Sequence, residues 1–250
     1  MNETDRSRSQ LARRLLMLVD LTSLNASDDE ATILKLAPLA CTPAGNVAAL
    51  CTWARLMPVA RSALCGSAIA LAAVANFPDG AADPEAAAAE TAAAIADGAN
   101  EVDVVFPYRA LLAGRPQAGL ALVRACRAAC GEHVLLKVIL ETGQLGSPAQ
   151  IRLAAEIAIE GGAHFLKTST GKSEPGATLE AAAVLLDAIA AARARSVAVG
   201  FKASGGIRTL EQARLYLQLY DSRFGDGSAT SANFRIGASA LIHPLLALLQ

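Results

Sequence analysis

The sequence predicts a single-domain (β/α)8 barrel, the TIM barrel of the α/β class, and three observations carry this prediction. The chain has 250 residues, which is near the usual size of such a barrel. Short apolar runs alternate with longer segments of helical period along the chain, a pattern typical of βα units around a parallel sheet. The runs number eight, which favours a closed barrel over a doubly wound open sheet, although alternation alone leaves both open.

The eight apolar runs are expected to be the barrel strands. In chain order they are residues 16–21, 47–51, 68–75, 101–106, 134–140, 165–168, 197–202 and 234–237. Helical patterns lie between them, and two of these, residues 84–97 and 149–159, end at glycines that suit a helix C-cap: Gly98, Gly161 and Gly162.

Small and branched side chains must fill the interior, because 53% of the residues are hydrophobic and only 4% are aromatic. No Pro-rich or Ser-rich linker divides the chain, and the Ala-rich stretch 86–94 is expected to be helical. We therefore expect one domain over residues 1–250, with a short polar N-terminal extension of about residues 1–10.

The charge balance excludes some partners. A formal net charge of -1 and a pI near 6.3 offer no long-range attraction to nucleic acid or to an anionic membrane, so any anion must bind locally. The first ten residues are mostly polar, and Arg13, Arg14 and Asp20 interrupt the apolar stretch that follows. We expect neither a signal peptide nor a membrane span, and a cytoplasmic location.

Five cysteines, an odd number scattered through the chain, indicate reduced thiols and no disulfide framework. Cys126 and Cys130 are four residues apart on a predicted helix, a spacing that could share a metal ion. Simple helix packing is the favoured interpretation, because a structural zinc site needs four ligands and no second pair is visible.

Charged residues interrupt several predicted strands that should be apolar on both faces. These residues are Asp103, Lys137, Lys167 and Lys202. Isolated buried charges cost several kcal/mol or more, so we expect these side chains to point into the barrel and pair there. Asp20, Lys167 and Lys202 are expected at the C-terminal ends of strands, which form the active-site face of such barrels. A purely structural ion network is the alternative.

Lysines outnumber carboxylates in these strands, which indicates a need for a neutral amine. If the Lys167 and Lys202 nitrogens are about 6 Å apart, their repulsion at an effective dielectric of about 20 is about 3 kcal/mol, or roughly two pKa units. The pKa of a lysine would then fall from about 10.4 toward roughly 8, where a useful fraction is nucleophilic.

Glycine-containing segments follow the last three predicted strands, at residues 168–172, 203–208 and 236–239. Glycines let backbone N–H groups approach a phosphate, and the late loops of a barrel are its usual phosphate site. Lys172 and Ser239 could add a charge and a hydroxyl. The segments predict a phosphorylated small molecule and not a dinucleotide, because no G-x-G-x-x-G follows the first strand.

Five segments closely resemble the deoxyribose-phosphate aldolase family: Val-Asp-Leu-Thr at 19–22, Glu-Val-Asp-Val-Val-Phe-Pro-Tyr-Arg at 101–109, Leu-Lys-Val-Ile at 136–139, Lys-Thr-Ser-Thr-Gly-Lys at 167–172 and Gly-Phe-Lys at 200–202. The resemblance runs from about Leu15 to Leu241. It implies a (β/α)8 barrel that reversibly cleaves 2-deoxy-D-ribose 5-phosphate to D-glyceraldehyde 3-phosphate and acetaldehyde in deoxyribonucleoside catabolism. It implies a sugar-phosphate substrate and neither metal nor other cofactor, and leaves a homodimer open.

The resemblance also implies roles for single residues. Lys167 matches the Schiff-base lysine, Lys202 the second lysine that perturbs it and shares proton transfer, and Asp103 the carboxylate of the proton relay. Lys137 matches a lysine that pairs with this carboxylate, and Asp20 and Thr22 match positions near the substrate hydroxyls. The expected phosphate cradle consists of Gly171, Lys172, Gly205, Gly206, Gly237 and Ser239, and Thr170 is expected to bind substrate beside it.

Two features depart from the family pattern. Ala240 follows Ser239 where the family often has a second serine, so one hydrogen bond to phosphate, worth about 1.5 to 3 kcal/mol at most, is lost. The sequence ends at Gln250 without the polar, tyrosine-terminated tail of some members, so we expect no contribution of such a tail to proton transfer.

Other functions compete with this interpretation. Another Schiff-base aldolase, or a metal-dependent aldolase or isomerase, is the nearest rival, but His133, His164 and His243 are not at C-terminal strand ends and suit a shared metal poorly. A sugar-phosphate-binding protein without chemistry is the second. Cys51 ends a predicted strand and could present a thiol to the substrate pocket, although a small apolar filler is the favoured interpretation.

Overall fold

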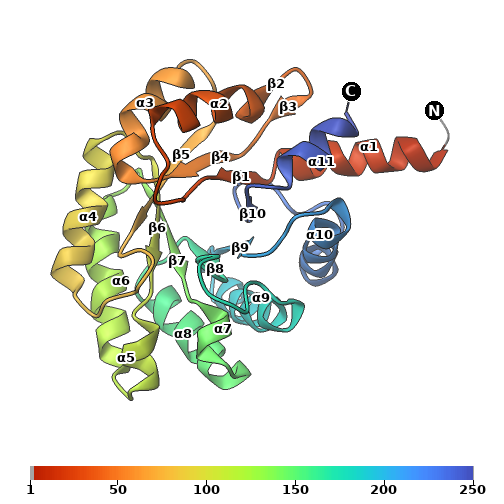
Figure 1. Cartoon of the computed structure of the whole chain (residues 1–250). Helices are drawn as coiled ribbons and strands as arrows, with labels where there is room; N and C mark the ends of the chain where they lie inside the picture. The colour runs from red at the N-terminus through yellow and green to blue at the C-terminus, as the bar shows by residue number, and fades with distance from the viewer. Residues whose placement is uncertain (1–2, 250) are drawn as a thin grey trace.

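The computed structural model describes residues 3–249, which form a closed barrel of eight parallel strands surrounded by helices (Figure 1). The barrel strands are β1 Val19–Thr22, β4 Ala49–Thr52, β5 Ala70–Ala75, β6 Glu101–Val105, β7 Leu135–Ile139, β8 Phe165–Lys167, β9 Gly200–Ser204 and β10 Phe234–Ala238. The helices are α1 Glu3–Leu16, α2 Glu30–Ala40, α3 Met57–Ala63, α4 Pro84–Ala96, α5 Tyr108–Leu112, α6 Pro116–Cys130, α7 Thr142–Leu145, α8 Pro148–Glu160, α9 Leu179–Arg193, α10 Leu210–Phe224 and α11 Ile242–Ala247.

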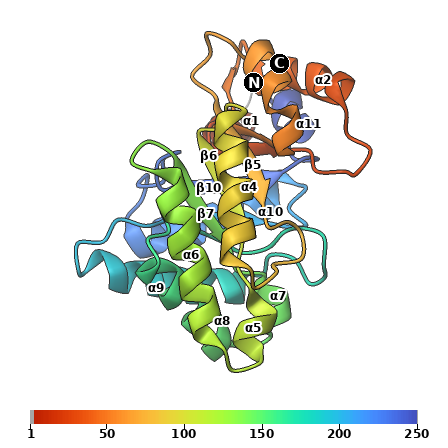
Figure 2. The same cartoon turned by 90° about the vertical axis from the view of Figure 1, so that its left-hand side faces the viewer.

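The predicted fold class is confirmed. Each barrel strand pairs in parallel with its neighbour in chain order, and β1 pairs with β10 to close the barrel. A separate two-stranded antiparallel hairpin, β2 Cys41–Thr42 and β3 Gly45–Asn46, lies between α2 and β4. Helices α4 and α6 run side by side against the barrel (Figure 2).

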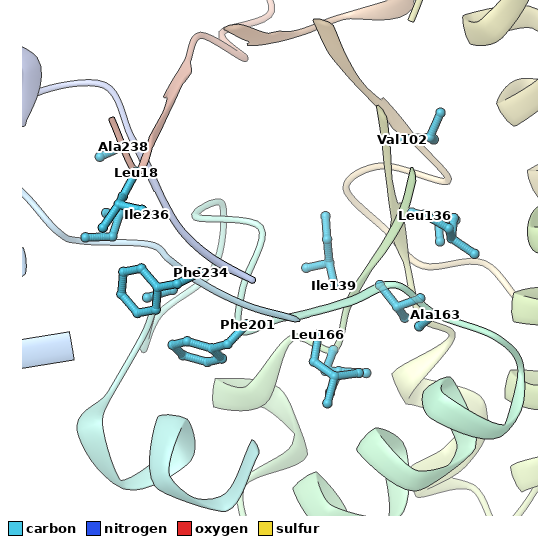
Figure 3. Packing of buried hydrophobic residues seen from close by; sticks show 14 of the residues in the cluster. Leu18, Val102, Leu136, Ile139, Ala163, Leu166, Phe201, Phe234, Ile236 and Ala238 are labelled. Carbon is cyan, nitrogen blue, oxygen red and sulfur yellow. The ribbon is translucent and has the colours of Figure 1, made fainter. Parts of the chain in front are cut away.

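Apolar side chains on the outer face of the strands form the main hydrophobic core with the helices. Val102, Leu136, Leu166 and Phe201 point away from the barrel interior (Figure 3), and each is fully buried. A parallel strand covered on both faces shows such residues at every second position. The outer layer therefore stabilises the barrel, and the alternate positions are left to face the axis.

The positions that face the barrel axis carry most of the charge. Lys167 and Lys202 are register partners on β8 and β9, and Arg235 on β10 pairs in turn with Lys202. On β6 and β7, Asp103 is the register partner of Lys137. Parallel register partners point to the same side of a sheet, so the pairing itself gathers these side chains inside the barrel.

Local sequence signals fix the helices that follow the strands. Helix α10 has a full capping box, in which the Thr209 side chain accepts from the backbone N–H of Gln212 and Gln212 caps in return. Helix α4 begins with Asp83 as N-cap and Pro84 in its first turn. Gly98, just past the end of α4, has φ +114, which an L side chain rarely adopts.

The predicted polar N-terminal extension of about residues 1–10 is helical from Glu3 onward. Helix α1 begins at Glu3 and lies beside α11 (Figure 1), where the Ser9 hydroxyl donates to the carbonyl of Leu248 at 2.9 Å. Ala12 and Leu15 are buried on its apolar face. The first strand was therefore predicted to begin too early, because Leu16 belongs to α1 and β1 starts at Val19. Within residues 3–249, no helix is long and apolar enough to cross a membrane.

Candidate active site

Seven charged side chains from six strands form one buried cluster inside the barrel. Each of them is at most 5% exposed. We call this set the barrel cluster; it consists of Asp20 on β1, Glu101 and Asp103 on β6, Lys137 on β7, Lys167 on β8, Lys202 on β9 and Arg235 on β10.

Asp103 is at the centre of the barrel cluster. Its Oδ2 accepts from Lys167 Nζ at 2.8 Å and from Lys202 Nζ at 2.7 Å, while Oδ1 accepts from Lys137 Nζ at 2.7 Å. The Lys167 and Lys202 nitrogens share one oxygen, so they lie closer together than the expected 6 Å. The structure thus brings the three proposed catalytic residues into direct contact.

Glu101 and Arg235 complete the cluster, and neither residue was predicted to be functional from the sequence. The Arg235 guanidinium donates to Asp20 Oδ1 and to Glu101 Oε1, each at 2.7 Å, and Glu101 Oε2 lies 2.6 Å from Lys137 Nζ. The signal was present, because Arg235 is a charge inside the predicted strand 234–237 and Glu101 opens the strand of Asp103. Without them Lys137 and Asp20 would have fewer partners.

The three lysines of the barrel cluster differ in their acid strength. Burial lowers the pKa of Lys167, Asp103 opposes this, and Lys202 lowers it further, so that the net pKa lies below the ordinary value. Burial also disfavours the charge of Lys202, but Asp103 and Asp20 outweigh it and raise its pKa. Asp103 and Glu101 raise the pKa of Lys137 in the same way. Lys202 therefore acts on Lys167 in the expected direction, but burial is the larger cause.

Asp103 and Asp20 stay ionised. Burial alone would raise the pKa of Asp103, but Lys137, Lys167 and Lys202 hold it well below its usual range. Lys202, Arg235 and Lys137 likewise outweigh burial at Asp20 and lower its pKa. Asp103 can thus accept hydrogen bonds from amines and hold a proton only transiently.

A polar cavity of about 240 Å³ opens among the loops at the C-terminal end of the barrel. Eight of the predicted substrate-binding residues line it: Thr22, Thr170, Gly171, Lys172, Gly205, Gly206, Gly237 and Ser239. Gly237 connects the cavity to the barrel cluster, because a Cβ at this position would lie 2.9 Å from Lys202 Cε. The cavity therefore adjoins the lysines without containing Lys167 in its wall.

Three of the four glycines in the cavity wall have backbone conformations that favour glycine. Gly171, Gly205 and Gly206 have φ of +76, +102 and +82. Turns of this kind can direct successive N–H groups toward an anion. Lys172 adds a cation, and the wall contains no carboxylate. The cavity can hold a phosphate.

Glu141, also missed by the sequence analysis, fixes the turn that carries Lys172. Its Oε2 accepts from the Thr170 hydroxyl at 2.6 Å, and the Thr170 Oγ1 accepts from the Lys172 N–H at 3.0 Å. Glu141 is buried and has φ +55, which is rare for a residue with a side chain. This strained, buried carboxylate at a strand end supports the wall of the cavity.

Three of the predicted substrate-binding residues lie deeper than the cavity wall, although Lys137 contacts Asp103 as expected. Asp20, Cys51 and Lys137 have no exposed surface and are not in the cavity wall. Burial raises the pKa of the Cys51 thiol, which packs with Leu24 and small residues of β4 and β5. Its environment suits an apolar filler more than a reactive thiol.

The placement of charges at strand ends was correct only for Lys167. Lys202 is the third of the five residues of β9, because the strand continues to Ser204, which pairs with Gly237. Asp20 is the second of the four residues of β1. The apolar run predicted for β9 ended at Lys202, but backbone pairing with β10 extends the strand past the charge.

The three histidines and the two cysteines of α6 lie away from the barrel cluster. His133 and His243 are exposed, and His164 Nδ1 accepts from the Leu136 N–H at 2.9 Å, before the start of β8. Cys126 and Cys130 are buried on α6 and belong to the hydrophobic core.

A larger cavity of about 540 Å³ lies at the opposite end of the barrel, near the start of β7, β8 and β9. Its wall is mostly apolar and contains no lysine, aspartate or glutamate; His164 and Arg193 are its titratable groups. Because the smaller cavity adjoins the barrel cluster and the larger one does not contain its residues, we take the smaller cavity as the candidate site.

Fold and site together define a (β/α)8-barrel enzyme, with its titratable groups inside the barrel and its cavity on the loops after the strands. Residues 14–223 match the family model described as "DeoC/LacD family aldolase". The chain belongs to this family of aldolases, which are enzymes acting on small molecules.

Solved structures that are similar to this chain share its fold. A candidate deoxyribose-phosphate aldolase from Toxoplasma gondii is 22% identical with a TM-score of 0.91, over 99% of this chain and 97% of that chain. A candidate from Coccidioides immitis is 28% identical with a TM-score of 0.81, over 94% and 86%. The deoxyribose phosphate aldolase of Aeropyrum pernix, a tetramer, is 24% identical with a TM-score of 0.75, over 97% of each chain.

Proposed function

We propose that this aldolase is a class I enzyme that reversibly cleaves 2-deoxy-D-ribose 5-phosphate to D-glyceraldehyde 3-phosphate and acetaldehyde. One observation carries the proposal: Lys167, an amine with a lowered pKa, donates to Asp103 beside a cavity suited to a phosphate. A neutral amine next to a carboxylate is what attack on a carbonyl requires. The names of the similar structures support the choice of substrate.

In the proposed reaction, the Lys167 Nζ attacks C1 of the open-chain sugar, and loss of water gives an iminium. The iminium accepts the electron pair of the C2–C3 bond as that bond breaks, while the C3 hydroxyl loses its proton. D-glyceraldehyde 3-phosphate leaves, and an enamine remains on Lys167. Protonation of the enamine at C2 and addition of water release acetaldehyde and restore the amine.

Asp103 and Lys202 are the proposed proton carriers. The Asp103 Oδ2 accepts from both lysines, so a proton taken up there is within one hydrogen bond of the Lys167 nitrogen. Lys202 has a raised pKa and stays charged, which lets it donate while its own proton is replaced. The pair would act through a bound water at C3 and at C2.

The phosphate would lie in the cavity, against the glycine turns, with the Lys172 ammonium as counter-charge and the Ser239 hydroxyl as donor. Thr22, which lines the cavity two residues after Asp20, is proposed to contact a substrate hydroxyl. Ala240 also lines the cavity. A serine at this position would place a second hydroxyl in the cavity wall, and this chain lacks it.

Turnover of 2-deoxyribose 5-phosphate, measured by coupled reduction of the released aldehydes, tests the proposal. The K167M variant should lose about a thousandfold or more of kcat, because no other amine contacts the Asp103 Oδ2 except the charged Lys202. K35M is the matched control, since Lys35 is exposed on α2. Full activity of K167M would contradict the proposed nucleophile.

Two outcomes distinguish the alternatives. A metal-dependent aldolase would lose its activity in a strong chelator, whereas the proposed enzyme keeps it. A sugar-phosphate-binding protein without chemistry would bind the substrate but give no aldehyde at any enzyme concentration.

A cytoplasmic location, a role in deoxyribonucleoside catabolism and a homodimeric assembly complete the proposal. They are supported by the sequence resemblance. Light scattering of the purified chain gives the assembly: a mass twice that of the 25.6 kDa chain supports the dimer, and any other mass contradicts it.

A further inference from the structure

The barrel cluster holds one more cationic group than it has carboxylates. The cations are Lys137, Lys167, Lys202 and Arg235, and the carboxylates are Asp20, Glu101 and Asp103. A buried cluster with unbalanced charge is costly, because little water reaches it to compensate. Loss of one proton from one cation balances the charge.

The contacts decide which cation gives up its proton. Arginine stays protonated under all ordinary conditions, so Arg235 is excluded. Lys202 lies 2.5 Å from Asp20 and 2.7 Å from Asp103, and Lys137 lies 2.6 Å from Glu101 and 2.7 Å from Asp103. Lys167 contacts only the Asp103 Oδ2, which it shares with Lys202.

Arg235 occupies the carboxylate oxygens that do not face Lys167. Its guanidinium donates to Asp20 Oδ1 and to both oxygens of Glu101. Its backbone carries it on β10 at the same register as Lys202, and Lys202 pairs with Lys167. A permanent charge is thus fixed two strands from the proposed nucleophile.

We propose that Arg235 is a positioning residue whose permanent charge sets the charge balance of the barrel cluster and thereby leaves Lys167 as the amine that loses its proton. The inference rests on the proposed function of Lys167 and adds the reason for its reactivity. Arg235 acts through the other charged groups, since its contacts are with Asp20, Glu101 and the carbonyl of Ser231.

The titratable groups that face the interior of the barrel, Lys167 included, come from seven of its eight strands. β5 contributes none, since its residues are alanine, leucine and valine. The groups are Asp20 on β1, the Cys51 thiol on β4, Glu101 and Asp103 on β6, Lys137 on β7, Lys167 itself on β8, Lys202 on β9 and Arg235 on β10. Cys51 is neutral because burial raises its pKa, so the charge count above holds.

The protonation of each lysine can be followed in the intact protein, because the chain contains five lysines: Lys35, Lys137, Lys167, Lys172 and Lys202. The Cε chemical shift of selectively 13C-labelled lysine reports loss of the proton, and the K167M spectrum assigns the Lys167 signal. In R235Q the cluster has three cations and three carboxylates. The Lys167 midpoint should rise by about one pH unit, so that the neutral fraction at a pH below both midpoints falls about tenfold.

Other variants separate charge from geometry. R235K keeps the charge and should keep the Lys167 midpoint of the unchanged protein. R235Q/E101Q removes one charge of each sign, so its midpoint should return toward that value, and E101Q alone should lower it. R14Q is the matched control: it breaks the Arg14 to Asp221 ion pair, 2.8 Å long and outside the barrel, and should shift nothing.

The order of midpoints decides the inference. The inference is supported if the Lys167 midpoint is lowest in E101Q and highest in R235Q. The unchanged protein and the double variant should then lie together between them. If R235Q does not fold, the comparison of E101Q with the double variant carries the same test. Equal midpoints in all folded variants, or equal shifts in R235K and R235Q, would overturn it and leave Arg235 a packing role.

The proposed function fails separately from this inference. A chain that forms no Schiff base but shows the expected order of midpoints would lose the first and keep the second. A chain that forms the Schiff base at Lys167 with midpoints unaffected by Arg235 would do the reverse.

Discussion

Asp103 has the most contacts with lysine in the barrel, and its single carboxylate serves three amines. This arrangement lets Lys167, the proposed nucleophile, be buried and still able to react. The carboxylate holds the amine in place, while burial and the neighbouring Lys202 disfavour its charge. Removing the Asp103 carboxylate should therefore slow proton transfer but increase the neutral fraction of the Lys167 amine.

The D103N variant exploits this opposition. Without the negative charge the Lys167 pKa should fall further, so formation of the Schiff base with acetaldehyde should persist at neutral pH. Turnover should drop by about a hundredfold to ten-thousandfold, because the proton carrier is lost. The ratio of trapped enzyme to turnover rate measures both; a loss of trapping in parallel with turnover would contradict the separate roles.

The A240S variant tests the phosphate cavity. Ala240 lines the cavity next to Ser239, and a hydroxyl there should add one hydrogen bond to the phosphate. The site is exposed, so we expect a modest gain, a KM for the phosphorylated sugar lower by about three- to tenfold. The KM for unphosphorylated 2-deoxyribose is the internal control, and an equal change in both would place the effect outside phosphate binding.

The residues of the site were predictable to different degrees. Asp103, Lys137, Lys167 and Lys202 stand out because each is a charge in an apolar strand. Arg235 is also a charge in an apolar strand, but it was not predicted as a site residue because an arginine is not a nucleophile. Glu141 could not have been found, since its role comes from a left-handed backbone and a contact with Thr170 across strands.

At the scale of the elements, β8 and β9 show how packing dictates sequence. Gly200 on β9 is the register partner of Phe165 on β8, and a Cβ at position 200 would lie 2.5 Å from the Phe165 ring. Phe165 is buried at the start of β8, two residues before Lys167, and its ring centre lies 5.7 Å from the Arg235 guanidinium carbon. The glycine makes room for the ring that supports the cluster.

The G200A variant should therefore be less stable by about 1 to 3 kcal/mol, because overpacking forces the ring or the backbone to move. Urea unfolding measures the change. The double variant F165L/G200A is the matched control, since the smaller side chain removes the clash and should recover part of the loss. Unchanged stability of G200A would show that the ring moves freely.

The order of the elements was largely predictable, and their ends were less so. Each of the eight strands overlaps one of the predicted apolar runs, because strands covered on both faces leave a continuous apolar signal. The β2–β3 hairpin and the short helices α5 and α7 were not predicted, since two to five residues are too few to show a period. Helix α1 begins in the polar stretch because only one of its faces is buried.

At the scale of the whole molecule, the barrel cluster links stability to pH. The pKa values of Asp20 and Asp103 are lowered on folding, so their contribution is present above about pH 4 and is lost as the pH falls through the lower folded values. The pKa values of Lys137 and Lys202 are raised, so their contribution is complete below about pH 10.5 and is lost above it. The pKa of Lys167 is lowered on folding, so burying this amine costs stability at neutral pH, and the cost decreases as the pH rises.

The urea midpoint should accordingly fall steeply below about pH 4, and the Lys167 amine should make it rise slightly as the pH increases from neutral toward about 10. One molar salt should change it little at pH 7, because the cluster is buried and screened weakly. A midpoint that stayed unchanged to pH 2 would mean that the buried carboxylates contribute nothing to stability.

The central claim is that Lys167 forms the covalent bond with the substrate, and reductive trapping tests it most directly. The protein is treated with acetaldehyde and borohydride at neutral pH, digested, and analysed by mass spectrometry. The account predicts an ethyl group on the Lys167 side chain, with Lys137 and Lys202 unmodified. An unmodified Lys167, or an adduct on another residue of the barrel cluster, would contradict it.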